Sequence, residues 1–338
     1  MEKGSPAPID VLVVGAGLAG AMAARESADA GLRVLVLDKG RGPGGRLSTR
    51  RVDGAGFDHG AACLQARGED FRAWLGVQVA AGRAAPWGEG WVGVPGMNML
   101  VAGLLEGIDV RWSTTVAALV RVAGHWQAID AKGLPFARAP RLVLAVPAPQ
   151  AHALLTATAA TTGWDAAGSA LVAALEQVQY APCWVGLAVV EGAEAHEPVI
   201  PEAAALAASG LAAVVREGAK PGRCDVGHWV VHADAGWSAL HLEQTAEDAA
   251  RCLRTAFVAA TGIDDSRIRS FGAHRWRYAR PLTGLDPALV VAVDGLALAG
   301  DAIGWHADEG VPPAERAWRS GREAAAHLRE ARPLQLKS

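Results

Sequence analysis

The chain contains few cysteines and lysines, and its net charge is small. The four cysteines, Cys63, Cys183, Cys224 and Cys252, lie far apart and form no C-x-x-C pair. This spacing argues against a metal site or a disulfide framework, so we expect no metal and a reducing, cytoplasmic compartment. The formal net charge is -3, and no block of like charge occurs. We therefore expect no nucleic-acid partner.

Long apolar runs are absent as well. Residues 11–24 are apolar, but they follow Asp10 rather than a basic segment and are too short to span a bilayer. We therefore expect no membrane partner. The sequence contains no G-x-S-x-G motif, which would indicate a serine hydrolase. By contrast, hydrophobic residues make up 51% of the 338 residues and glycines number 40. This composition favours a folded enzyme with many tight turns and close backbone approaches.

A glycine-rich turn lies inside the first strand–helix–strand pattern, residues 9–37. In its sequence G-A-G-L-A-G, Gly15 permits a tight turn and Gly17 lets the backbone approach a pyrophosphate. Gly20 allows the helix to pack closely on the strand. Asp38 closes the second strand, where its carboxylate can accept both ribose hydroxyls and disfavours a 2′-phosphate. The pattern predicts a dinucleotide site.

Two further segments favour FAD over NAD. Residues 39–46 form a second glycine-rich and basic loop, in which Arg46 can pair with a phosphate. Near the C-terminus, an apolar strand ends in Gly300-Asp301, and this aspartate can hold a ribityl hydroxyl. The helix that begins at Pro312 can direct its positive end toward the flavin. We therefore expect non-covalent FAD. The expected cofactor-binding residues are Gly15, Gly17, Leu18, Ala19, Gly20, Asp38, Lys39, Gly45, Arg46, His59, Gly60, Ala61, Val116, Gly300, Asp301 and Val311.

The order of apolar runs predicts an α/β (α+β) fold with two domains. A Rossmann-like FAD-binding domain is expected from three separate pieces, residues 1–65, 95–155 and 285–338. A substrate domain with a mixed or antiparallel sheet is expected from the inserted residues 66–94 and 156–284. Residues 40–60 are expected to be an extended loop.

The chain resembles the bacterial renalase-like flavoproteins, a branch related to flavin amine oxidases. The resemblance rests on 15–20, on D-K-x-R-G-P-G-G-R-L-S-T-R-R at 38–51 and on F-D-H-G-A at 57–61. It continues through W-V-G-V-P-G-M at 91–97, H-R-W-R-Y at 274–278, and Gly300-Asp301. The resemblance implies a fold like that of p-hydroxybenzoate hydroxylase. It also implies oxidation of 2- or 6-dihydro-NAD(P) to NAD(P)+ by hydride transfer to FAD, with O2 as electron acceptor and hydrogen peroxide as product.

The chain departs from the family pattern in two places. Residues 62–65 read A-C-L-Q, where the family usually has Gln, an aromatic pair and Thr. Residues 302–313 replace the usual glycine-rich turn and helix start. Both stretches are expected close to the flavin, so these departures leave FAD binding intact and put the identity of the substrate in question.

Candidate catalytic residues come from one probable strand and one turn. Alternation places His274, Trp276 and Tyr278 on one face of that strand, which we expect to face the flavin. Packing in the core would explain the same pattern. Trp305 follows Gly300-Asp301 and is also expected in the pocket. For His59, a contact with the flavin and a hydrogen bond that fixes the loop remain equal alternatives.

Two other functions stay open. A flavin amine oxidase or monooxygenase would act on another small flat substrate, but an amine oxidase often has a lysine beside the flavin. Only Lys39, Lys132 and Lys220 lie between the termini. A flavin-binding sensor without turnover is the alternative of another class. Among the 12 tryptophans, Trp87, Trp91, Trp184, Trp229 and Trp276 fall in the predicted substrate-domain strands, which suggests an aromatic-walled pocket.

Overall fold

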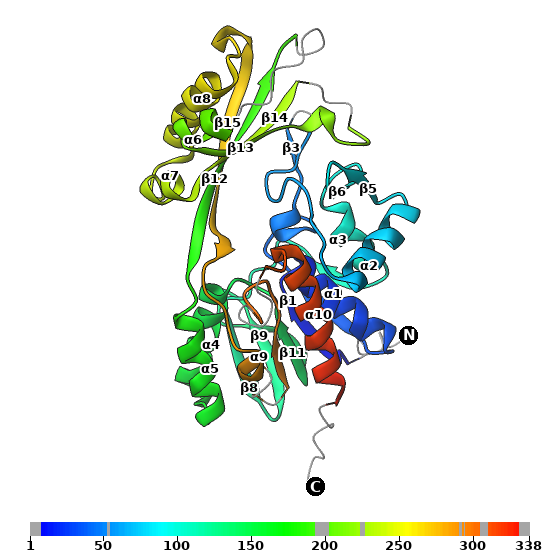
Figure 1. Ribbon diagram of the computed structural model, residues 1–338. Coiled ribbons are helices and arrows are strands. Elements are labelled where there is room, and N and C mark those ends of the chain that lie inside the picture. Colours follow the sequence, from blue (N-terminus) through cyan, green and yellow to red (C-terminus); the bar gives the residue numbers. More distant parts are fainter. Residues whose placement is uncertain are drawn as a thin grey trace, which may run out of the picture.

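A five-stranded parallel sheet forms the base of the molecule (Figure 1). This computed structural model describes residues 8–52, 55–192, 203–223, 227–290, 293, 295–304 and 310–330. The strand order is β16-β11-β1-β2-β7. The strands are β1 (Val11–Val14), β2 (Val34–Leu37), β7 (Asp109–Arg111), β11 (Arg141–Leu144) and β16 (Leu296–Leu298).

Both faces of this sheet are covered, which explains why its central strands are apolar throughout. Val11 and Val13 of β1 face one core cluster, whereas Leu12 and Val14 face another. Helices α1 (Leu18–Asp29) and α10 (Pro313–Glu330) pack side by side on the first face. The opposite face is covered by a three-stranded antiparallel sheet and two further helices. These are β8 (Ala118–Val122), β9 (His125–Ile129), β10 (Pro135–Ala139), α4 (Ala148–Thr162) and α5 (Ala166–Glu176).

A four-stranded antiparallel sheet in the order β13-β14-β12-β15 forms the other end of the molecule. Two long strands, β12 and β15, pair along their length and connect this sheet to the base (Figure 1). Its core lies against α8 and includes the buried Trp184, Trp229 and Phe257. The elements are β12 (Tyr180–Val190), β13 (Leu211–Arg216), β14 (His228–Ala233), β15 (Ile268–Pro281), α6 (Ala203–Ala208), α7 (Ala235–Leu240) and α8 (Ala246–Thr261).

Two hairpins and two helices lie between these sheets. The hairpin of β3 (Arg50–Val52) and β4 (Ala55–Phe57) rises from the base toward the four-stranded sheet (Figure 1). The second hairpin joins β5 (Ala84–Trp87) to β6 (Gly90–Gly93). The helices are α2 (Glu69–Ala80) and α3 (Met99–Leu104). The short elements that remain are α9 (Pro287–Val290), η1 (Gly45–Leu47), η2 (Glu217–Ala219) and η3 (Asp265–Arg267).

The expected fold class is confirmed, since a parallel dinucleotide-binding sheet is combined with antiparallel sheets. Within residues 40–60, however, the structure has η1 and the β3–β4 hairpin rather than an extended loop. The buried side chains of α2, β5 and β6 pack in the same cluster as α1 and α10. The expected domain boundaries, which assign 66–94 to the substrate domain, stay a prediction. No helix in the described part of the chain is long and apolar enough to cross a membrane.

Candidate functional site

A cleft of about 2140 Å³ begins at the carboxyl ends of the parallel strands and extends to the four-stranded sheet. Open α/β sheets bind their ligands at this edge. The volume exceeds the roughly 300–1,000 Å³ of a pocket for one small ligand. The cleft therefore has room for a dinucleotide and a substrate together.

The first phosphate cradle is the turn between β1 and α1. Gly15 has a φ of 108°, a conformation that favours glycine. A Cβ atom on Gly20 would lie 1.9 Å from the carbonyl oxygen of Gly15, so helix and strand can approach closely only with glycine there. Gly17 precedes the first residue of α1, and no side chain caps this helix end. The free N–H groups at the start of α1 are therefore available to an anion.

Gly17 differs from Gly15 and Gly20 because neither its backbone conformation nor a neighbouring atom excludes a larger side chain. A Cβ atom there would have only the Cα of Gly45 within 4 Å, at 3.9 Å. Its φ of -78° and ψ of -177° are open to any residue. Gly17 lines the cleft, and the space beside it fits a pyrophosphate. This open cradle is the feature that best fits a bound dinucleotide.

Asp38 lies at the end of β2 beside the same cradle. Its carboxylate accepts hydrogen bonds from the backbone N–H groups of Ala16, at 2.5 Å, and Gly40, at 2.6 Å. These bonds fix the carboxylate at the cleft wall while leaving further lone pairs for ribose hydroxyls. Lys39 and Val116 line the same part of the cleft.

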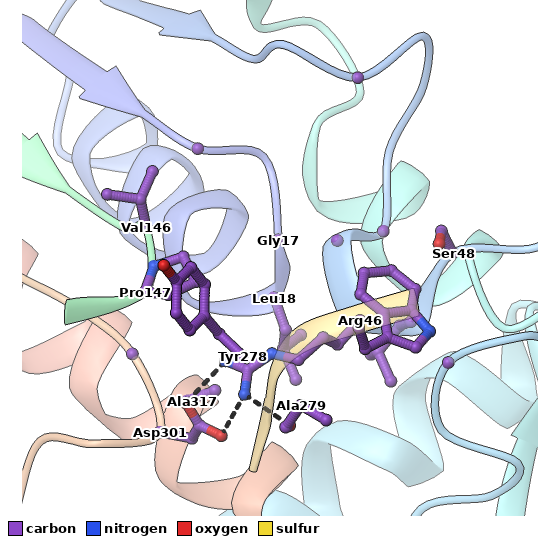
Figure 2. A pocket seen from close by; sticks show the side chains of 18 of the residues that line it. Gly17, Leu18, Arg46, Ser48, Val146, Pro147, Tyr278, Ala279, Asp301 and Ala317 are labelled. Atoms are coloured by element: carbon purple, nitrogen blue, oxygen red, sulfur yellow. Dashed lines mark hydrogen bonds and ion pairs between the residues drawn. The ribbon is translucent and has the colours of Figure 1, made fainter. Parts of the chain in front are cut away.

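The second cradle is the glycine-rich loop at residues 39–46, and the third is the turn at Gly300-Asp301 after β16. An ion pair joins them. Arg46 donates two hydrogen bonds to the Asp301 carboxylate, at 2.7 and 2.6 Å, and one to the carbonyl oxygen of Ala279, at 3.1 Å (Figure 2). Figure 2 shows Arg46 extended along the cleft toward Asp301, with Tyr278 nearby. The Asp301 side chain is only 4% exposed. The pair ties the loop after β16 to the glycine-rich loop after β2, and both groups face the cleft.

The loop from His59 to Ala61 is held on several sides. A Cβ atom on Gly60 would lie 1.9 Å from the carbonyl oxygen of Arg46. Ala61 donates its N–H to that oxygen at 2.9 Å. Trp276 donates its indole N–H to the carbonyl oxygen of His59 at 2.7 Å. The loop is thus fixed mainly through its backbone, which leaves the His59 ring at the cleft.

Three rings form one wall of the cleft. The His59 and His274 rings meet edge to face with centroids 4.8 Å apart, and Trp276 lies 5.2 Å from His59 and 4.6 Å from His274. Burial, followed by the neighbouring His274, lowers the pKa of His59 to about 4. Burial, followed by the charge of Arg50, also lowers the pKa of His274. Both imidazoles are therefore neutral at neutral pH, and the buried Nδ1 of His59 has no hydrogen-bond partner in the described structure.

The two tyrosines of the chain lie together on another part of the wall. Tyr180 and Tyr278 come from the paired strands β12 and β15, and their rings meet edge to face at 5.6 Å. The backbone N–H of Ala148 donates to the Tyr180 hydroxyl at 3.3 Å. Burial, followed by the charge of Asp301, raises the pKa of Tyr180 to about 12. This phenol therefore stays protonated and can donate a hydrogen bond into the cleft.

Directly behind the His59 loop lies a buried cluster of four charges. The Lys220 ammonium donates to Asp58 at 2.9 Å and to Glu217 at 2.7 Å, and all three side chains are 0% exposed. Arg223 pairs with Asp58 at 2.5 Å. Asp58 also accepts hydrogen bonds from the Thr49 hydroxyl and the Met97 backbone N–H. The cluster, with two cations and two anions, joins the base of the molecule to the segment between β13 and β14.

The structure brings most of the residues expected at the site into one cleft. The lining includes Gly15, Gly17, Leu18, Ala19, Asp38, Lys39, Gly45, Arg46, His59, Gly60, Ala61, Val116, His274, Trp276, Tyr278, Gly300 and Asp301. Gly20 packs inside the first cradle instead, and Val311 accepts a hydrogen bond from Arg316 outside the lining. Trp305 lies outside the described residues. The roles of all these expected site residues remain predictions.

Of the five strand tryptophans, only Trp276 lines the cleft. Trp184 and Trp229 are 2% exposed and pack in the core behind the four-stranded sheet. Trp87 and Trp91 pack against the cluster around α1. The hypothesis of a pocket walled by these five tryptophans is wrong, because an alternating strand buries one of its two faces in the core.

Tyr180, Arg50 and the buried charge cluster were not expected at the site from the sequence. The spacing of Glu217, Lys220 and Arg223, three residues apart each time, was a signal for a common charged side. The position of Asp58 next to the apolar Phe57 was another signal that could have indicated this cluster. Tyr180 gave no signal, because its place at the cleft depends on the pairing of β12 with the distant β15. The place of Arg50 depends on how the β3–β4 hairpin packs on the four-stranded sheet, which no local pattern predicts.

Taken together, the described residues fit FAD. The open cradle at Gly17 and the fixed carboxylate of Asp38 match a pyrophosphate and a ribose. Arg46 and Asp301 match the second phosphate region and a polyol, and the neutral ring wall matches a flat aromatic system. No group of three or more potential metal ligands occurs within the described ranges.

Comparison with known proteins agrees with this geometry. Residues 13–76 match the family of NAD(P)-binding Rossmann-like domains. The MnmC protein of Ralstonia nicotianae, a bifunctional protein of tRNA 5-methylaminomethyl-2-thiouridine biosynthesis, is 28% identical over 197 residues, which are 40% of this chain and 30% of that protein. The alpha subunit of sarcosine oxidase from Corynebacterium is 46% identical over 76 residues, which are 22% of this chain and 7% of that protein. The chain thus spans less than a third of these curated relatives.

Solved structures share the fold over nearly the whole chain. A protein named as a protoporphyrinogen oxidase from Exiguobacterium sp. 255-15 has a TM-score of 0.65 at 14% identity, covering 95% of this chain and 99% of that one. Putrescine oxidase bound to putrescine has a TM-score of 0.61 at 14% identity, covering 95% of this chain and 99% of that one. At these identities, the likeness shows a common fold and leaves the reaction open.

Proposed function

We propose that this protein is an FAD-dependent oxidoreductase of the renalase-like type, which oxidises 2- or 6-dihydronicotinamide isomers of NAD(P) to NAD(P)+. One observation carries this proposal: a single cleft passes all three cradles and ends at a wall of neutral rings. When bound, FAD supplies the ring that accepts hydride and passes the electrons to O2, which yields hydrogen peroxide.

The chain's own residues position the cofactor and the substrate. The N-terminus of α1 and Arg46 hold negative charge, and Asp38 and Asp301 accept hydroxyl hydrogen bonds. Trp276, anchored on the His59 carbonyl oxygen, gives a flat face for a nicotinamide ring.

Neutral imidazoles suit this reaction better than charged ones. A dihydropyridine that loses hydride becomes a cationic aromatic ring, so an imidazolium beside it would oppose the reaction electrostatically. The pKa of His59 near 4 keeps this ring neutral through the neutral pH range. No proton has to leave the substrate carbon. The wall therefore needs to orient the ring and exclude water rather than supply a base.

A second candidate function is amine oxidation, and the Tyr180–Tyr278 pair favours it. Two aromatic rings at 5.6 Å on the cleft wall can contact an amine through their π faces. The likeness to putrescine oxidase and sarcosine oxidase points the same way. Lys220, however, is engaged with Asp58 and Glu217 rather than free to act at the cleft.

The experiment that tests the first proposal is anaerobic reduction. FAD-loaded protein is mixed with 2- or 6-dihydro-NAD(P), with 4-dihydro-NAD(P), and with putrescine or sarcosine in separate runs. Rapid bleaching of the visible flavin band by the 2- or 6-dihydro isomers is the expected result. Bleaching by an amine alone would support the second candidate. No bleaching by any dihydronicotinamide would overturn the renalase-like proposal.

A further inference from the structure

The lining of the cleft contains a cationic side chain that has no partner among the described residues. Arg50, the first residue of β3, lines the cleft with its side chain exposed. Within the described residues it has no hydrogen bond or ion pair through its guanidinium. Among the other arginines of the lining, Arg46 pairs with Asp301, and Arg275 and Arg277 pair with Glu243. Arg41, Arg51 and Arg280 line the cleft as well, but Arg50 differs from them in that it lies across the β3–β4 hairpin from Phe57. An unpaired guanidinium inside a ligand cleft is a potential anion contact.

The position of Arg50 follows from the β3–β4 hairpin. Arg50 pairs with Phe57 across the hairpin, so their side chains share one face. On that face Phe57 and Val52 pack against the four-stranded sheet. The hairpin extends from the glycine-rich loop after β2 toward the four-stranded sheet (Figure 1). Trp276 of that sheet packs against the same cluster as Phe57 and Val52.

The charge of Arg50 acts on the ring wall. It contributes to lowering the pKa of both His59 and His274, so its guanidinium lies within electrostatic reach of both rings. Further along this end of the cleft the lining is mainly small and apolar, with Ala212, Ala213 and Ala235. If the flat ring of a ligand lies beside His59, an anionic group of the same ligand can therefore contact the guanidinium of Arg50.

We propose that Arg50 binds a phosphate group of the substrate while the ring to be oxidised lies against His59, His274 and Trp276. The inference rests on the proposed function and adds to it the residue that would recognise the substrate's phosphate and so favour a nicotinamide nucleotide over the riboside. Arg50 then acts in binding and leaves the transfer step itself to the cofactor and the ring wall. A bidentate contact between guanidinium and phosphate accounts for the choice of a nucleotide.

The test compares a ligand with a phosphate to one without. FAD-loaded wild-type, Arg50→Gln and Arg51→Gln proteins are titrated anaerobically with the 6-dihydro forms of nicotinamide mononucleotide and of nicotinamide riboside, and flavin reduction is followed. Arg51→Gln changes net charge equally at the next residue, which also lines the cleft but lies on the other face of β3. For Arg50→Gln, the apparent Kd of the mononucleotide should rise about tenfold or more, and that of the riboside should stay unchanged. Arg51→Gln should change both values by less than about threefold.

Several outcomes would overturn the proposal. These are equal affinity of the wild type for the two ligands, no change in Arg50→Gln, or equal losses in both variants, which would indicate a general cationic field. If neither ligand reduces the flavin, the proposed function fails. The anion contact is then tested by calorimetric titration with oxidised nicotinamide mononucleotide and riboside. Binding of the mononucleotide that weakens in Arg50→Gln would support the contact, and binding independent of Arg50 would refute it.

Discussion

Lys220→Met should destabilise the fold strongly, because it leaves buried carboxylates without their shared cation. Lys220 contacts Asp58 at 2.9 Å and Glu217 at 2.7 Å, and all three side chains are fully buried. Removing one partner of such a pair costs about 3–5 kcal/mol. Arg223 remains on Asp58 at 2.5 Å but lies 3.7 Å from Glu217. Glu217 therefore carries most of the loss, and we expect about 3 kcal/mol.

Urea unfolding of flavin-free protein measures this loss without the contribution of cofactor binding. Lys132→Met, at an exposed position, is the matched control and should change the free energy of unfolding by less than about 0.5 kcal/mol. The double variant Glu217→Gln, Lys220→Met should recover much of the loss, because it removes the unpaired charge. A loss of less than about 1 kcal/mol in Lys220→Met would refute the reasoning.

The same variant should respond to pH in a defined direction. Burial already raises the pKa of Glu217, and loss of the ammonium would raise it further. A raised pKa in the folded state means that the folded variant binds this proton more tightly than the unfolded chain. The gap in stability between wild type and Lys220→Met should therefore narrow as the pH falls from about 8 to about 5. A constant gap would contradict the assignment to Glu217.

Three further predictions concern the cleft. Gly17→Ala should leave the stability of the flavin-free protein within about 0.5 kcal/mol of wild type and weaken FAD binding at least about tenfold by calorimetry. Gly76→Ala, where a Cβ atom would meet nothing within 4 Å, should leave FAD binding unchanged. The pKa of His59 is about 4 in the folded state and about 6.5 in the unfolded state, so the unfolded state binds more protons as the pH falls. The free energy of unfolding of the wild type should therefore fall by about 2 kcal/mol from this group between about pH 7 and pH 5. Urea unfolding should show that His59→Asn lacks this loss. Arg46→Lys cannot form both hydrogen bonds to Asp301, so its melting temperature without FAD should fall by a few degrees; an unchanged value would speak against the pair.

How much the sequence could predict depended on whether the signal was local. The turn at Gly15 and Gly17, the acid at Asp38 and the strand with His274 and Trp276 are local patterns, and each residue lies at the cleft. The pairing of Arg46 with Asp301 joins residues 255 positions apart, and no spacing predicts such a contact.

The missed cluster has the same explanation. Asp58 and Lys220 are 162 positions apart and meet only because the β3–β4 hairpin packs on the four-stranded sheet. Periodicity places a side chain on one face of its own element, but it does not say which other element covers that face. Alternation could therefore group His274 with Trp276, whose rings lie 4.6 Å apart. It could not tell a cleft-facing Trp276 from a core-packed Trp184.

The most direct test of the central claim is the identity and amount of the bound cofactor. The wild-type protein, saturated with FAD and freed of excess, is denatured, and the released flavin is identified and quantified against protein concentration. FAD should be released intact, at about one molecule per chain, since the cradles would hold it without a covalent bond. Protein that takes up no flavin, or a dinucleotide other than FAD in its place, would contradict the account.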